Sequence, residues 1–142
     1  MITGDILRIP GDDFFFAAKI IWISQWYKDA MGIVIYPGWF EDPEQVRPVE
    51  GEYLAMKMGN ADVRVLYPSI KKIWTVIGHS PLNERDRELC FHLDGGTLYD
   101  GDDSVRNATS DDYARFSPVL AAGPVVVQNL IRQARSTIPR ID

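Results

Sequence analysis

The residue types best suited to chemistry in this chain are one cysteine and two histidines. Cys90 and His92 stand at positions i and i+2, so on a strand they would share a face and could act as nucleophile and base. His79 could join them only through a turn at Gly78. The sequence shows no evident oxyanion hole or orienting group. We therefore interpret Cys90 and His92 as the solvated polar face of a strand, and we predict that the protein is not an enzyme.

Metal chemistry finds even less support in the pattern. Zinc sites need three or four ligands at constrained spacing, and the chain contains neither a CxxC nor an HxxxH motif. Residues 100–104 (DGDDS) show a faint likeness to a calcium loop, but Val105 stands where the turn glycine should be and no glutamate closes the loop. We predict no metal and no cofactor, and we interpret 100–104 as an acidic surface turn.

Acidic side chains recur in the predicted loops and give the chain a net charge of −5. This balance disfavours nucleic acid as a partner, because phosphate binding depends on lysine and arginine. If the acidic turns lie at one end of the sheet, their carboxylates form one negative field that would steer a basic protein. The alternative is that they only keep the domain soluble. Our candidate partner-binding residues are Glu84, Asp86, Glu88, Asp100, Asp102, Asp103, Trp39 and Phe40, and Trp26 and Tyr27 are further aromatic candidates.

The bulk composition is that of a globular domain. A chain of 142 residues fits one domain with one core, and 46% hydrophobic with 25% charged residues is typical of soluble proteins. A single cysteine cannot form an internal disulfide. The N-terminus lacks the pattern of a signal peptide, and no apolar run reaches the roughly 18 residues of a membrane span. We therefore expect a cytosolic protein that does not contact a membrane.

The candidate residues named above must be positioned mostly by β-strands. We expect residues 14–23, apolar except for Lys19, to lie in the middle of the sheet. Residues 73–77, a β-branched and aromatic run, should form a strand buried on both faces. We interpret 83–88 as a charged turn and 94–96 as a hairpin turn. Further strands are expected at 5–9, at 31–36 (ended by Pro37 and Gly38), at 63–67, at 89–93 and at 97–99.

One long helix is expected near the C-terminus. Pro124 suits the first helical position, and one apolar stripe follows it, made of Val127, Leu130, Ile131, Ala134 and Ile138. The connections between strands are mostly too short for a crossover helix, which favours antiparallel pairing. The predicted fold class is α+β: a strongly bent antiparallel sheet or partly open barrel of about six or seven strands, with the C-terminal helix packed on it.

Two short motifs mark a family resemblance. Residues 4–10 (GDILRIP) and 74–82 (WTVIGHSPL) resemble an opening Gly-Asp-hydrophobic-x-Ile-Pro strand and a Trp-x-x-Ile-Gly strand end followed by Pro-Leu. Both features are typical of the immunity protein 26 family of bacterial polymorphic-toxin systems, and the resemblance spans 4–100. It implies a cytosolic antidote that blocks a toxin by tight binding, with no catalytic residues to transfer. The matching positions, which we expect to hold the fold, are Gly4, Asp5, Pro10, Trp74 and Gly78.

The leading hypothesis is thus a non-enzymatic immunity protein that binds and neutralises a cognate bacterial toxin domain. A nuclease would suit an acidic inhibitor, which could cover its basic cleft. A first alternative is a small-molecule-binding module whose bent sheet encloses a pocket lined by Trp22, Trp74 and Phe91. A second, less favoured alternative is a hydrolase that uses Cys90 with His92.

Overall fold

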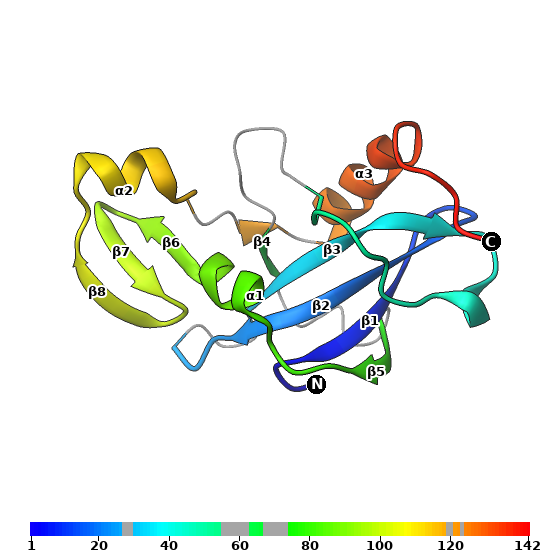
Figure 1. The fold of residues 1–142 in the computed structure, drawn as a ribbon, viewed down its shortest axis with the longest axis horizontal. Helices are drawn as coiled ribbons and strands as arrows, with labels where there is room; N and C mark the ends of the chain where they lie inside the picture. The colour runs from blue at the N-terminus through cyan, green and yellow to red at the C-terminus, as the bar shows by residue number, and fades with distance from the viewer. Residues whose placement is uncertain (27–29, 55–62, 67–73, 119–120, 123) are drawn as a thin grey trace.

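The computed structural model describes residues 1–26, 30–54, 63–66, 74–118, 121–122 and 124–142. Within these ranges the chain forms a six-stranded sheet in the order β5-β1-β2-β3-β4-β9 and a three-stranded sheet in the order β6-β7-β8 (Figure 1). Neighbouring strands are antiparallel except β4 and β9, which are parallel. The α+β class, with a bent, unclosed and largely antiparallel sheet and a C-terminal helix, is confirmed.

The element bounds are as follows. The strands of the larger sheet are β1 (Asp5–Pro10), β2 (Phe15–Ile23), β3 (Met31–Phe40), β4 (Val63–Leu66), β5 (Thr75–His79) and β9 (Ala121–Ala122). Those of the smaller sheet are β6 (Phe91–Asp94), β7 (Thr97–Asp100) and β8 (Asp103–Asn107). The helices are the 3-10 turn η1 (Pro43–Gln45), α1 (Glu84–Leu89), α2 (Ser110–Arg115) and α3 (Pro124–Arg135).

Strand β2 lies inside the sheet with both faces covered, as predicted. Its alternate residues enter two cores: Phe16 and Ile20 pack in the core that α3 covers, while Ala17 and Ile21 face the other core. The period of two in a strand explains this division, because successive side chains point to opposite faces. Lys19 is the one charged residue of this strand and is only 2% exposed. It therefore requires a partner inside the protein.

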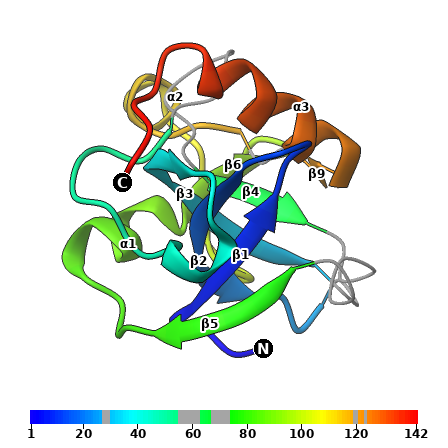
Figure 2. The ribbon, with the colours of Figure 1, turned by 90° about the vertical axis from the view of Figure 1, so that its right-hand side faces the viewer.

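Helix α3 packs on one face of the sheet through the predicted stripe (Figure 2). Val127 and Ile131 are buried there, and Leu130 packs against the same core. Arg132 donates two hydrogen bonds to Asp12, from Nε at 2.8 Å and from Nη2 at 2.9 Å, in the turn between β1 and β2. These exposed ion pairs orient the helix and contribute little to stability compared with its apolar stripe.

The prediction of a doubly buried strand at 73–77 is wrong for 74–77, and Ile73 lies outside the described residues. The described strand there, β5, is an edge strand: it pairs only with β1 in the described part of the chain, and four of its five residues are exposed. Trp74, just before β5, is the residue that enters the core and is 4% exposed. The β-branched pattern indicated a strand correctly, but its place at the edge is set by pairing with a distant segment.

Two local predictions also need correction. Residues 84–89 form helix α1 rather than a turn, because Asn83 and Asp86 form a reciprocal capping box: Asn83 Oδ1 accepts from Asp86 N at 2.8 Å, and Asp86 Oδ2 accepts from Asn83 N at 3.1 Å. Strand β3 does not end at Pro37 but continues to Phe40. An irregularity in its register with β2 accommodates the proline, which cannot donate to the ladder.

Candidate functional site

The candidate site is a depression of about 400 Å³ where the end of β2 meets the turn between β7 and β8. A pocket of this size lies within the usual range of ligand sites, roughly 300–1,000 Å³. Its walls combine aromatic, acidic and apolar side chains from parts of the chain that are far apart in sequence. The lining residues are Thr3, Ile21, Trp22, Ile23, Gln25, Trp26, Cys90, Asp100, Gly101, Asp102 and Asp103.

The turn between β7 and β8 owes its position to Gly101. Asp100 and Asp103 are paired across the strands, so only Gly101 and Asp102 form the loop, and Gly101 has a φ of +59°. Its backbone N–H donates to the carbonyl of Cys90 at 3.0 Å. A Cβ at this position would lie 3.2 Å from Cδ1 of Trp22. Glycine thus permits both the tight turn and its close contact with Trp22.

Asp102 fastens this turn to the end of β2. Its Oδ1 accepts hydrogen bonds from Ser24 Oγ at 2.7 Å and from Trp22 Nε1 at 3.3 Å, and its Oδ2 accepts from the backbone N–H of Gln25. The carboxylate predicted to bind a partner is therefore occupied within the chain. Its role in the structure is to position the depression, because it joins two loops separated by more than seventy residues.

Asp100 and Asp103 are two further carboxylates that line the depression. Both are exposed, and they are direct cross-strand neighbours. In the part of the chain that the structure describes, neither side chain makes a hydrogen bond or an ion pair. Like charges placed directly opposite each other destabilise a sheet. The arrangement thus leaves a negative charge at the depression that no described cation neutralises.

Two tryptophans form the aromatic part of the site. Trp26 is 78% exposed, the most exposed of the large hydrophobic side chains in the described ranges. Trp22 is half-buried and stacks on His92 with ring centroids 4.9 Å apart, and His92 in turn stacks on Tyr99 at 5.7 Å. The stack holds Trp22 in place, while Trp26 presents its ring to solvent.

The structure does not pair the thiol of Cys90 with the imidazole of His92. The thiol lies 3.4 Å from the carbonyls of Ile21 and Asp86, and Nδ1 of His92 lies 2.9 Å from the carbonyl of Cys90. Burial raises the pKa of the Cys90 thiol to about 12, and the charges of Asp100 and Asp86 act in the same direction. Both side chains are buried, so the prediction of a solvated face is wrong. The thiol is poorly suited to nucleophilic attack.

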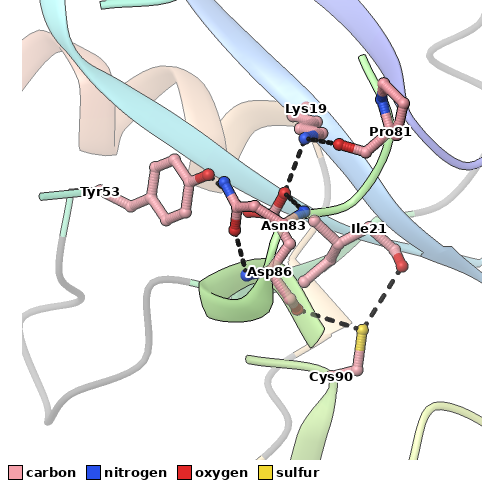
Figure 3. A network of polar contacts seen from close by, with 7 residues as sticks. All are labelled: Lys19, Ile21, Tyr53, Pro81, Asn83, Asp86 and Cys90. Carbon is pink, nitrogen blue, oxygen red and sulfur yellow. Dashed lines mark hydrogen bonds and ion pairs between the residues drawn. The ribbon is translucent and has the colours of Figure 1, made fainter. Parts of the chain in front are cut away.

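Helix α1 is anchored beside the depression by a buried polar network (Figure 3). Lys19 Nζ donates to Asp86 Oδ2 at 2.6 Å and to the carbonyl of Pro81 at 2.8 Å, and Tyr53 donates its hydroxyl proton to Asp86 Oδ1. The two charged side chains are 2% and 0% exposed. Burial raises the pKa of Tyr53, and its hydrogen bond to Asp86 acts in the same direction. Asp86, predicted to contact a partner, is instead buried and paired.

The other predicted site residues lie elsewhere. Glu84 and Glu88 are exposed on α1. Trp39 and Phe40 end β3 at the opposite end of the β2–β3 pair, where Phe40 is fully buried. Trp39 is half-buried, and its Nε1 donates to the carbonyl of Ile138 at 2.9 Å, which ties down the C-terminal segment. The eight candidates therefore do not form one surface.

The pocket imagined between Trp22, Trp74 and Phe91 does not form either. Trp74 packs in the core under α3, Phe91 packs on Phe116 with ring centroids 5.7 Å apart, and Trp22 belongs to the opposite core. Of these, Trp22 alone lines the depression. Its role could not be found from sequence, because it depends on a turn eighty residues away. The polar neighbours of Trp26 in the sequence were a signal of its exposure.

The two motifs behind the family resemblance lie side by side in β1 and β5. Asp5 Oδ1 lies 3.0 Å from Nδ1 of His79, and Ser80 N donates to the carbonyl of Gly4 at 2.9 Å. Burial acts to raise the pKa of Asp5, but the hydrogen bonds from Ile2 N and His79 keep it below its ordinary value. Gly4 has a φ of +97°. These motif residues hold the sheet edge together.

No family model, no curated protein and no solved structure matches this chain. Among the described side chains, no group of three or more His, Cys, Asp or Glu residues is placed to hold a metal ion. None of the described helices has the length and apolar character needed to cross a membrane.

Proposed function

We propose that this chain is a non-enzymatic protein that binds and neutralises a cognate bacterial toxin domain in the cytosol, with the depression as its contact site. The observation that carries the proposal is the exposed Trp26 beside the carboxylates of Asp100 and Asp103, which have no ion-pair partner among the described residues. Tryptophan is enriched among residues that dominate binding energy at interfaces. Unpaired carboxylates at such a site favour and steer a basic partner.

The identity of the partner rests on the family resemblance. The residues that resemble motifs of the immunity protein 26 family lie in β1 and β5 or directly before them, and a net charge of −5 suits the inhibition of a protein with a basic cleft, such as a nuclease. The buried, high-pKa thiol of Cys90 and the separate bonding of His92 weigh against the hydrolase alternative. The proposal therefore assigns the protein a binding task and no reaction of its own.

The test is a pull-down of the tagged protein from its native host and from cells that co-express the gene immediately upstream. We expect a toxin C-terminal domain to co-purify stoichiometrically and its toxicity to be suppressed. Recovery of the protein without a toxin from both sources would contradict the proposal. Asp100→Lys/Asp103→Lys should abolish capture, whereas Glu50→Lys/Glu52→Lys, which changes the net charge equally at two exposed positions, should preserve it.

The exposed carboxylates of α1 provide a second, weaker test. Reversal of Glu84 and Glu88 should slow association with the toxin while leaving dissociation nearly unchanged, because exposed charges act mainly through long-range steering. The effect should be larger at low salt, where screening is weak. Stopped-flow association rates across a salt series measure it, and rates equal to wild type at low salt would remove α1 from the steering surface.

A further inference from the structure

We infer, on the basis of the proposed function, that the depression receives an arginine side chain of the partner, which packs on the exposed ring of Trp26 and pairs with the carboxylates of Asp100 and Asp103. The pocket is concave and its aromatic wall is a separate observation from its charge. Together they require an occupant that is both cationic and able to pack flat on a ring. A guanidinium group meets both requirements, whereas a lysine ammonium is a compact and strongly hydrated point charge.

The charge of the site favours a cationic occupant. Asp100 and Asp103 face each other across the strands at an energetic cost. Three of the described cations are paired with other aspartates: Lys19 with Asp86, Arg106 with Asp112, and Arg132 with Asp12. A planar guanidinium can donate to two carboxylates at once. An arginine from the partner would therefore relieve the repulsion between these two carboxylates.

The site is also preformed. Asp102 locks the turn to Ser24 and Trp22, and the ring of Trp22 is fixed by its stack on His92. Ile21 and the neutral thiol of Cys90 add uncharged surface to the depression. A site that needs little ordering keeps more of its contact energy as affinity.

The experiment compares hexa-arginine with hexa-lysine by isothermal titration calorimetry on the full chain. The wild type should bind hexa-arginine at least about threefold more tightly than hexa-lysine, because guanidinium stacks on the aromatic faces. Asp103→Asn and Trp26→Ala should each remove this preference. The matched controls Glu52→Gln and Tyr113→Ala change an exposed carboxylate and an exposed aromatic that do not line the depression, and they should retain it.

Equal affinities for the two peptides in the wild type, or a preference that survives both site variants, would overturn the inference. Its failure can be separated from failure of the proposed function. If Asp103→Asn and Trp26→Ala capture the toxin as tightly as wild type, the function stands and the arginine site is wrong. If the arginine preference maps to the depression but no toxin is captured, the arginine site stands and the toxin assignment is wrong.

Discussion

The sequence led us to expect one negative field formed by acidic residues that include Asp86, Asp100 and Asp103. In the structure Asp86 is buried, whereas Asp100 and Asp103 are exposed. Asp86 is 0% exposed and is bound by Lys19 and Tyr53. Asp100 and Asp103 are exposed, face each other and make no described ion pair. The first carboxylate is satisfied within the chain, whereas the other two have no ion-pair partner among the described residues.

This difference shows that burial distinguishes charged residues that stabilise the fold from charged residues that can bind a partner. A charge removed from water must be paired, so a buried aspartate is tied to its partner by the fold itself. A surface carboxylate is solvated and can remain unpaired at a small cost. An unfavourable surface pair beside an exposed tryptophan therefore carries more information about binding than a well-paired charge does.

The largest expected effect is the loss of the buried pair. Asp86→Ala should lower the free energy of unfolding by about 3–5 kcal/mol, because it leaves Lys19 charged and buried without a carboxylate. Urea denaturation followed by tryptophan fluorescence measures the change. Lys19→Met combined with Asp86→Leu should cost less than the sum of the two single changes. A loss below about 1 kcal/mol for Asp86→Ala would show that the pair does not anchor α1.

The sequence predicted those parts of the fold that depend on local pattern. The stripe of α3 and the hairpin at Asp94–Gly96 follow from residues that are neighbours in the chain, and both are present. The edge position of β5 and the two-sheet arrangement depend on pairing between distant segments, which a period of two cannot specify. Helix α1 is a local feature that we predicted as a turn, although Asn83 and Asp86 have the spacing of a capping box in the sequence.

The site was less predictable than the fold. Lys19 was visible in the sequence as the one charge of an apolar strand, but its pairing with Asp86 among many acids needed the structure. The acidic segment 100–104 was predicted as a turn, but only Gly101 and Asp102 form it, because β8 begins at Asp103. The contact of this turn with Trp22 depends on a long-range approach through Gly101. Charge and exposure of individual loops can be predicted from sequence, but which loops meet cannot.

A smaller effect of opposite sign is expected at the turn. Asp103→Asn should raise the free energy of unfolding by about 0.2–1 kcal/mol, because it removes the repulsion with Asp100, even as it weakens binding of hexa-arginine. The same denaturation assay measures it. Asp100→Asn should give a similar gain, and the double variant should add little, since one repulsion is shared. Destabilisation by either single change would mean that these carboxylates serve the fold.

The smallest effect concerns pH and the histidine behind Trp22. Burial lowers the pKa of His92 below 6.5, while its hydrogen bond to Cys90 and the charges of Asp94, Asp102 and Asp100 act in the opposite direction. The unfolded chain therefore binds the proton more readily, so stability should fall as the pH drops below about 6.5 toward the folded-state value. His92→Phe keeps an aromatic ring in the stack and should flatten the stability profile between pH 6.5 and about 5, above the range in which the lowered pKa of Asp5 matters. An equal slope in both proteins would show that the negative charges of the acidic turn fully offset the effect of burial on the pKa of His92. The electric field of the turn at His92 would then be stronger than the exposure of the turn to solvent implies.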